Sequence, residues 1–199
     1  MRDTYPRTEA SLIHKVGDQL ITVDDFLDDF DPIRAELVAN DFIDGFNTAD
    51  GVTYPHLIEN VPQRAREQII ESIGEPVELF ARMSPSGVIA PHPVHSDTLQ
   101  SNVTMILYIN DGIDEESFGT GIMRHHETGL MQTPINDAEM KIWQDSYQHP
   151  HQWETVHFFQ GKANRAIFFD SRLMHMAFPY NGFGQTPEDA RLIIGGFFA

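Results

Sequence analysis

The sequence contains no cysteine among its 199 residues. This absence excludes disulfides, cysteine-ligated zinc, iron–sulfur clusters and thiol nucleophiles. Basic residues are also scarce, because 13 Lys and Arg stand against 30 Asp and Glu and give a formal net charge of −17. Such an acidic excess provides no counterion release on a phosphate backbone, so duplex nucleic acid is disfavoured as a partner.

Long apolar runs are missing as well. No run approaches the roughly 18 residues expected of a membrane span, and the N-terminus lacks the apolar core of a signal peptide. We therefore expect a cytoplasmic protein without a membrane partner. A chain of 199 residues with 41% hydrophobic side chains and no internal repeat or linker suits a single domain over residues 1–199.

The order of the predicted elements indicates the fold class. Residues 1–76 are expected to form a helical N-terminal support, with a short strand at 20–23 and helices at about 31–40 and 61–73. A core of strands follows over 77–199, interrupted by a short helix at about 138–147. The strands are expected at 77–83, 88–90, 91–97, 102–110, 119–126, 153–159, 164–169 and 191–198. This pattern predicts a mainly β protein with flanking helices, built as a double-sheet jelly roll or cupin-like barrel.

The segment His95-Ser96-Asp97 provides the first chemical signal. Side chains two residues apart on a strand project from the same face, so this imidazole and this carboxylate can reach one metal ion. His175 is the best candidate for a third ligand. Two His and one carboxylate form the facial triad of non-haem Fe(II) oxygenases, which leaves the opposite face of the metal open.

Other histidines are weaker candidates. His92 falls on the opposite face from His95 if the segment is extended, although the intervening Pro93 can interrupt that alternation. His125 and His126 point to opposite faces of one strand, so at most one of them lines the pocket. His157 is interpreted as a satisfied strand residue.

Arg191 stands in the apolar strand Arg191-Leu192-Ile193-Ile194. A buried guanidinium is costly without an anionic partner. That partner is either a carboxylate of the protein in a structural salt bridge or the carboxylate of a ligand, bound bidentately.

Residues 77–198 resemble the 2-oxoglutarate-dependent Fe(II) oxygenase superfamily, in particular its prolyl-4-hydroxylase-like branch. His95, Asp97 and His175 match the metal ligands, Arg191 matches the basic residue of the last core strand, and Tyr108-Ile109-Asn110 resembles the Tyr-Leu-Asn strand of that branch. Two features depart from the pattern. Thr120 interrupts the usual Gly-Gly turn. The loop between His175 and Arg191 is longer than in prolyl hydroxylases.

The resemblance implies a double-stranded β-helix in which Fe(II) is held by His95, Asp97 and His175. It also implies 2-oxoglutarate as cosubstrate, with its 5-carboxylate on Arg191 and the Tyr108 hydroxyl, and O2 as the oxidant. Asn102, Thr104 and Asn110 share the Tyr108 face of their predicted strand, so Asn102 and Asn110 are predicted to line the cofactor pocket. Arg124 or His125 is predicted to face the substrate.

The leading hypothesis is a dioxygenase that hydroxylates a peptide, an amino acid or another small molecule while 2-oxoglutarate is converted to succinate. Two alternatives remain open at this stage. One is a β-sandwich binding module in which the His-x-Asp is incidental, and the other is a cupin-like metalloenzyme that does not use 2-oxoglutarate. Substrate selection is expected in the loops at about 42–60, 111–118 and 133–152.

Overall fold

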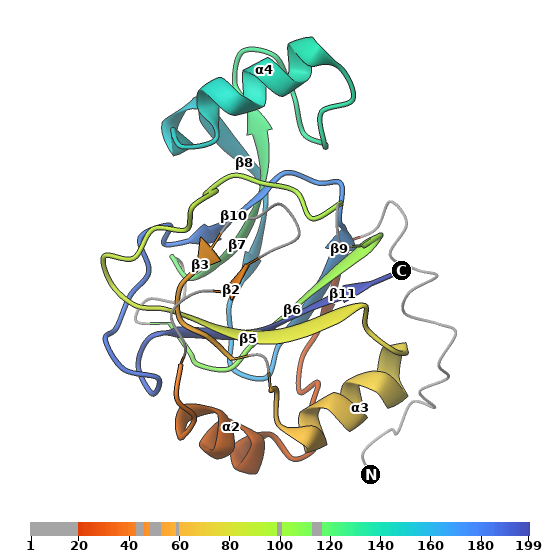
Figure 1. Cartoon of the computed structure of the whole chain (residues 1–199), viewed down its shortest axis with the longest axis vertical. Helices are drawn as coiled ribbons and strands as arrows, with labels where there is room; N and C mark the ends of the chain where they lie inside the picture. The colour runs from red at the N-terminus through yellow and green to blue at the C-terminus, as the bar shows by residue number, and fades with distance from the viewer. Residues whose placement is uncertain (1–19, 43–45, 48–52, 59, 99–100, 113–116) are drawn as a thin grey trace.

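The computed structural model describes residues 20–42, 46–47, 53–58, 60–98, 101–112 and 117–199. Two antiparallel sheets form the core (Figure 1). The larger sheet has the strand order β1 (Ile21–Val23), β9 (Ala166–Asp170), β6 (Val103–Tyr108), β11 (Arg191–Phe198), β5 (Glu78–Ser84) and β4 (Leu57–Ile58). The smaller sheet has the order β10 (His175–Phe178), β7 (Gly119–His125) and β8 (Trp153–Gln160). A separate pair joins β2 (Phe46–Asn47) to β3 (Thr53–Tyr54).

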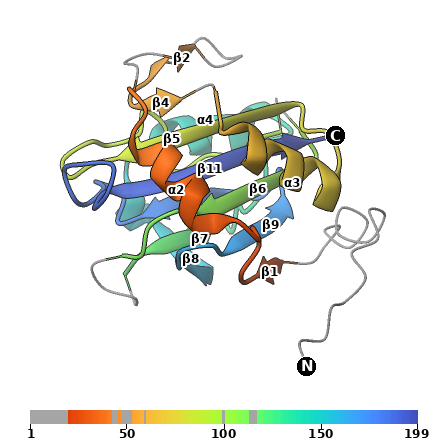
Figure 2. The same ribbon diagram turned by 90° about the horizontal axis from the view of Figure 1, so that it is seen from below.

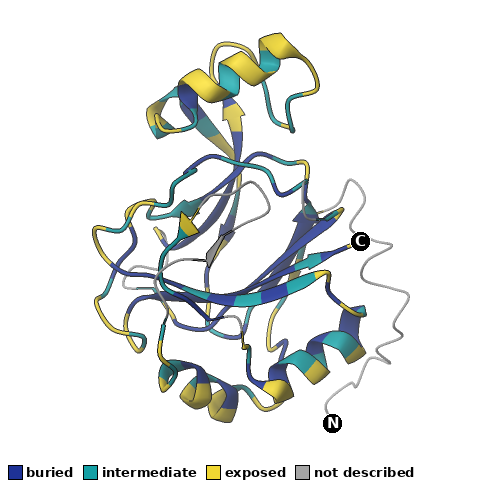
Figure 3. Cartoon of the chain, in the orientation of Figure 1, coloured by how far each residue is buried: buried dark blue, intermediate teal, exposed yellow. Residues whose placement is uncertain are grey.

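Helices flank this core. Helices α2 (Phe30–Val38) and α3 (Gln63–Ile73) cover the outer face of the large sheet (Figure 2). In α3 the buried residues Ala65, Ile69 and Ile73 are spaced four apart, so they form one stripe toward the sheet while the opposite face is exposed (Figure 3). Helix α4 (Asp137–Ser146) and the 3-10 turn η1 (Pro150–Gln152) lie beyond the far end of the small sheet. None of the described helices is long and apolar enough to cross a membrane.

Strand alternation divides the large sheet into two faces. On β11, Leu192 and Ile194 pack into the cluster shared with α2 and α3, whereas Ile193 belongs to the cluster between the two sheets. The register pairs Ile193 with Arg82 of β5 and with Tyr108 of β6. Arg191, with the same parity as Ile193, therefore lies on the interior face with Arg82 and Tyr108.

The predicted fold class is confirmed, since the chain is mainly β with two antiparallel sheets in a jelly-roll arrangement. The predicted helices at 31–40, 61–73 and 138–147 correspond to α2, α3 and α4 within one to two residues. Residues 20–76 contain more than helices, because β1 and β4 add strands to the large sheet at its two edges. The short pairing of β2 with β3 was not predicted.

The strands predicted at 88–90 and 91–97 are wrong. Residues 85–98 and 101–102, the described part of the connection between β5 and β6, contain no strand and contribute only an isolated bridge between His95 and His175. Pro91 and Pro93 supply no backbone N–H to a sheet ladder, which accounts for the irregular path. His95 and Asp97 nevertheless come together, because backbone bonds to another segment hold them in place.

Candidate metal centre and its cavity

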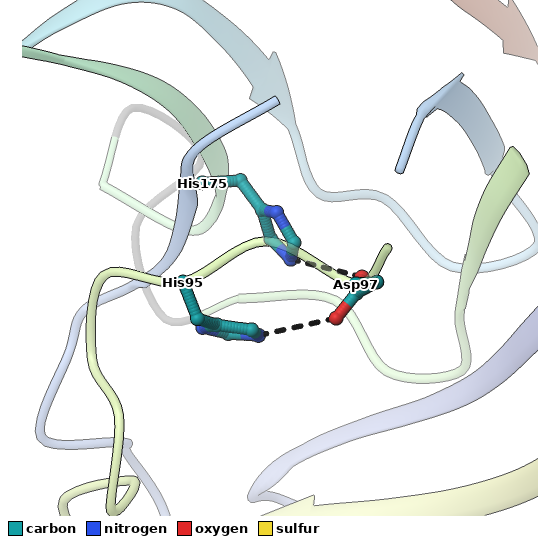
Figure 4. A group of neighbouring side chains, drawn as sticks. All are labelled: His95, Asp97 and His175. Atoms are coloured by element: carbon teal, nitrogen blue, oxygen red, sulfur yellow. Dashed lines mark ion pairs between the residues drawn. The ribbon is translucent and has the colours of Figure 1, made fainter. Parts of the chain in front are cut away.

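His95, Asp97 and His175 form one cluster, and the ligand atoms that they offer lie within 4.8 Å of one another. The two carboxylate oxygens of Asp97 face the two rings (Figure 4): Oδ1 lies 3.6 Å from His95 Nε2 and Oδ2 lies 3.3 Å from His175 Nε2. The ring centroids of the two histidines are 4.4 Å apart. Among the described residues this is the only group of three or more His, Asp or Glu with such spacing.

Backbone hydrogen bonds bring these ligands together from distant parts of the sequence. His95 N donates to His175 O at 3.1 Å, and His175 N donates to His95 O at 2.8 Å, so the two histidines form a reciprocal antiparallel bridge. Asp97 N donates to Ser171 O at 2.8 Å. Helix α4 adds a further tie, because Trp143 Nε1 donates to Val94 O at 2.9 Å. The positions of the three side chains are therefore set by the main chain.

The protonation states suit a divalent cation. His175 Nδ1 lies 3.0 Å from Leu173 O, and donation of an N–H there leaves Nε2 with its lone pair facing Asp97. Burial lowers the pKa of His95 to about 4, and the His175 ring acts in the same direction, so His95 is neutral at pH 7. Thr104 Oγ1 donates to Asp97 Oδ2 at 2.9 Å and orients the carboxylate. Two imidazoles and one oriented carboxylate are the donor set of a 2-His-1-carboxylate Fe(II) site.

Arg191 and Tyr108 lie together on the interior face of the large sheet. Arg191 is 3% exposed, and its guanidinium carbon lies 6.0 Å from the centre of the Tyr108 ring. Arg191 Nε has no hydrogen-bond partner, and no carboxylate within the described ranges forms an ion pair with this residue. The structural salt bridge considered from the sequence is thus not observed in the described part of the chain.

Tyr108 is fully buried, and its hydroxyl donates to Thr120 Oγ1 at 2.7 Å. Burial raises the pKa of Tyr108 to about 12, so the phenol stays protonated. Its single proton is committed to Thr120, which stands between Gly119 and Gly121 on β7. The departure at Thr120 therefore matters more than the sequence indicated, because its hydroxyl occupies the proton of the tyrosine.

Asn102 and Asn110 lie outside β6, at its two ends. The side chain of Asn110 is occupied by the protein itself: its oxygen accepts from Arg34 Nε at 3.0 Å, and its nitrogen donates to Pro187 O and Ala190 O, both at 2.8 Å. Asn102 is exposed, and its backbone bonds to Phe198 and Ser171. A cofactor-binding role for either asparagine stays a prediction that these contacts do not support.

The other histidines considered as ligands from the sequence occupy three different environments. His92 lines the same cavity as His95, contrary to the expectation of opposite faces, with Nδ1 3.4 Å from the Tyr54 hydroxyl. His125 packs on Trp153 and lines a separate hollow with His126, while Arg124 forms an ion pair with Glu154 on the exposed side of β7. Neither Arg124 nor His125 lines the cavity beside the metal cluster, and the expectation that one of them faces the substrate stays a prediction that this placement does not support. His157 is exposed on β8, against Phe159.

A cavity of about 250 Å³ opens beside the metal cluster. Its wall is largely apolar and includes Leu57, Phe80, Met140, Trp143, Met174 and Phe197. The described parts of two predicted substrate loops, 42–60 and 133–152, contribute to it through Tyr54, Leu57, Thr133 and α4. The segment 113–116 of the third predicted loop lies outside the described residues.

Arg82 is a cavity residue that sequence analysis did not single out. The sequence did contain an indication, because Arg82 stands in a largely apolar strand, as Arg191 does in β11. In both cases the guanidinium needs an anionic partner. The Arg82 guanidinium carbon lies 4.8 Å from the centre of the Tyr54 ring.

No protein-family model matches the chain, and no curated protein sequence is significantly similar to it. Solved structures do share its fold. One is the non-heme alpha ketoglutarate dependent epimerase SnoN from nogalamycin biosynthesis, with 15% identity, a TM-score of 0.51, and alignment over 90% of this chain and 77% of SnoN. Another is the non-heme alpha ketoglutarate dependent carbocyclase SnoK from the same biosynthesis, with 13% identity, a TM-score of 0.51, and alignment over 89% and 78%.

A Pseudomonas putida prolyl-4-hydroxylase aligns over 91% of this chain and 92% of its own, with 15% identity and a TM-score of 0.48. The chain therefore has the jelly-roll fold of the non-heme 2-oxoglutarate-dependent enzymes. The assignment to the prolyl-4-hydroxylase-like branch stays a prediction.

Proposed function

We propose that this protein is an Fe(II)- and 2-oxoglutarate-dependent dioxygenase that oxidises a small molecule or a peptide. The observation that carries the proposal is the cluster of His95, Asp97 and His175, which offers a facial donor set on one side of a cavity. The three side chains would hold the metal. Bound Fe(II) with 2-oxoglutarate would supply the oxidising chemistry, in which O2 oxidises the substrate and 2-oxoglutarate becomes succinate and CO2.

Arg191 is the residue proposed to bind the 5-carboxylate of 2-oxoglutarate. Its guanidinium is buried on the interior face, and no ion pair within the described ranges neutralises it. A dicarboxylate would provide the missing anion and two charge-assisted hydrogen bonds. Because Tyr108 donates its proton to Thr120, the Thr120 hydroxyl keeps its own proton, and we propose that Thr120 donates to this carboxylate in place of Tyr108.

The surroundings of the cluster are largely apolar, and we propose that they limit the entry of water once substrate is bound. The Phe169 ring packs edge-on against His175 with centroids 4.8 Å apart, and Met174 and Trp143 lie on the cavity wall. Exclusion of water strengthens the interaction of Arg191 with an anion and limits side reactions.

The direct test is anaerobic titration of the metal-free protein with Fe(II) and then 2-oxoglutarate, monitored by the weak visible charge-transfer band of an Fe(II)–2-oxo acid chelate. The band should form in the native protein, be lost in His175→Ala, and require far more 2-oxoglutarate in Arg191→Met. His157→Ala is the matched control, because His157 is an exposed histidine outside the cluster. Its titration should equal that of the native protein.

The same titration separates the alternatives. Iron binding without the band would favour a metalloenzyme that does not use 2-oxoglutarate, and absence of iron binding would favour a binding module. The type of oxidation needs product analysis, since SnoN and SnoK are described as an epimerase and a carbocyclase. Hydroxylation is the outcome we propose, and an oxygen atom from 18O2 in the product would support it.

A further inference from the structure

Arg82 introduces a positive charge into an otherwise mostly apolar cavity. Burial lowers its pKa to about 10, with Arg191 acting in the same direction and Tyr54 opposing, so the guanidinium is charged at neutral pH. Its Nε is cut off from solvent and has no hydrogen-bond partner. Within the described ranges no carboxylate forms an ion pair with Arg82.

The two acids that line the cavity do not neutralise Arg82. Glu78 lies four residues away on the same strand, which places its backbone about 13 Å from that of Arg82. Asp97 faces the two histidines of the proposed metal centre. The contact with the Tyr54 ring offsets part of the cost of desolvating the charge, but it supplies no acceptor for the Nε–H, which has no hydrogen-bond partner.

Arg82 and Arg191 are neighbours on the interior face of the large sheet. The register of β5 and β11 pairs Arg82 with Ile193 and Ser84 with Arg191, so the two arginines are diagonal cross-strand neighbours. Arg191 is buried and Arg82 is half-buried on the cavity wall, so each is stabilised by an anion of its own. One carboxylate of 2-oxoglutarate is assigned to Arg191, and its other carboxylate belongs to the metal chelate, so Arg82 has no partner in the cosubstrate.

The two arginines also differ in what they face. Arg191 is buried beside the Tyr108 ring and is not part of the cavity lining, whereas Arg82 lines the cavity together with His95, Trp143 and Phe197. A single guanidinium matches the geometry of one carboxylate, and a phosphate dianion would call for further cations. The rest of the wall suits a hydrocarbon or aromatic body.

Resting on the proposed function, we infer that the substrate is an apolar organic carboxylic acid whose carboxylate binds Arg82. Its hydrocarbon or aromatic part then lies against Trp143, Phe80, Phe197 and Met174, beside the metal cluster. The arginine fixes the orientation of the substrate, and the apolar wall provides most of the buried area. Arg82 is thus the specificity-determining residue of the cavity.

The test uses the metal-free protein and pairs of probes that differ only in charge: 3-phenylpropionate against 3-phenylpropionamide, and octanoate against octanamide. Calorimetric titration should show tighter binding of at least one acid than of its amide. Arg82→Met should weaken binding of that acid about 10- to 100-fold, the usual effect of losing charged hydrogen bonds. Its affinity for the amide should stay within a factor of about two.

Arg165→Met is the matched control, because Arg165 pairs with Asp24 and neither residue lines the cavity, so its acid binding should equal that of the native protein. Arg82→Lys keeps the charge without the bidentate fork and should show an intermediate loss. Circular dichroism verifies that each variant is folded. If Arg82→Met does not fold, the comparison of acids with amides in the native protein and the Arg82→Lys titration still decide the question.

Three results would overturn the inference. The first two are amides that bind as tightly as the acids and acid binding that is unchanged in Arg82→Met. The third is an Fe(II) band that needs as much additional 2-oxoglutarate in Arg82→Met as in Arg191→Met. The last result would assign Arg82 to the cosubstrate. Failure of the proposed function can be told apart from failure of this inference, because the two are measured separately. A native protein that forms no Fe(II)–2-oxoglutarate band contradicts the proposed function, whereas binding of the probes to the metal-free protein does not depend on that band. Acid-selective binding without the band would support Arg82 as a carboxylate site in a protein of another function.

Discussion

Replacement of Arg191 by methionine should stabilise the protein in the absence of cosubstrate. Methionine has a similar length and is apolar, so it can occupy the same interior position without a charge. Arg191 is 3% exposed, its Nε has no partner, and it forms no ion pair within the described residues. Arg191 therefore carries a desolvated charge that no carboxylate of the described residues neutralises.

The magnitude follows from two opposing contributions. Desolvation of one buried ion costs several kcal/mol even after the structure relaxes. The Tyr108 ring, 6.0 Å from the guanidinium carbon, returns at most about 2 kcal/mol through a cation–π interaction. We expect a net gain of about 1–4 kcal/mol in the free energy of unfolding. For a domain of this size that gain corresponds to a rise in Tm of roughly 2–16 °C.

Urea unfolding of the metal-free protein, with and without 2-oxoglutarate, measures both consequences. Arg191→Met should be more stable than the native protein alone and should gain nothing from 2-oxoglutarate. Arg165→Met is the control, since Arg165 has a bidentate partner in Asp24, and it should lose up to about 1 kcal/mol. A clear loss of stability in Arg191→Met would refute the reasoning, because it would mean that the native guanidinium is already neutralised.

Three further predictions concern the metal centre and its surroundings. The pKa of His95 is lowered from 6.5 to about 4 in the folded protein, so as the pH falls the unfolded chain binds a proton at this residue before the folded protein does. The free energy of unfolding of the metal-free protein should therefore decrease by about 2–3 kcal/mol between pH 6.5 and pH 4, measured by urea unfolding. Thr104→Val removes the donor to Asp97 Oδ2 and should weaken Fe(II) binding about 10- to 100-fold in a chelator competition, and unchanged affinity would contradict the orienting role. Asn110→Ala leaves Arg34 Nε and two backbone carbonyls without a partner and should cost about 1–3 kcal/mol in unfolding free energy, with Fe(II) affinity unchanged.

The metal cluster could be predicted because its signal is local and chemical. His95 and Asp97 are two residues apart, and their residue types are typical of metal ligands whatever the precise backbone path. The path itself was predicted incorrectly, since Val88-Ile89-Ala90 has strand propensity but no partner strand in the structure. Pairing depends on distant segments, which a single sequence does not place.

Predictions that extended strand parity beyond the strand ends did less well. Asn110 has the parity of Tyr108, but β6 ends at Tyr108 and the asparagine turns into contacts with the loop before β11. Arg82 was not predicted as a cavity residue, although it lies within β5 and follows the regular alternation of that strand. Its position on the cavity wall depends on α4 and the segment at 54–57, which the sequence does not place.

The reciprocal backbone bonds between His95 and His175 have a consequence for assembly of the chain. About 80 residues separate the two histidines, and that interval contains β6, β7, α4, β8 and β9. One ligand belongs to a strand of the small sheet, and Asp97 is oriented by a strand of the large sheet, so neither sheet alone presents the complete set. A cation that needs all three ligands therefore binds only the fully assembled protein, and its binding free energy adds to the stability of the whole fold. Occupancy of the site by a metal ion therefore indicates that both sheets of the chain are folded and joined.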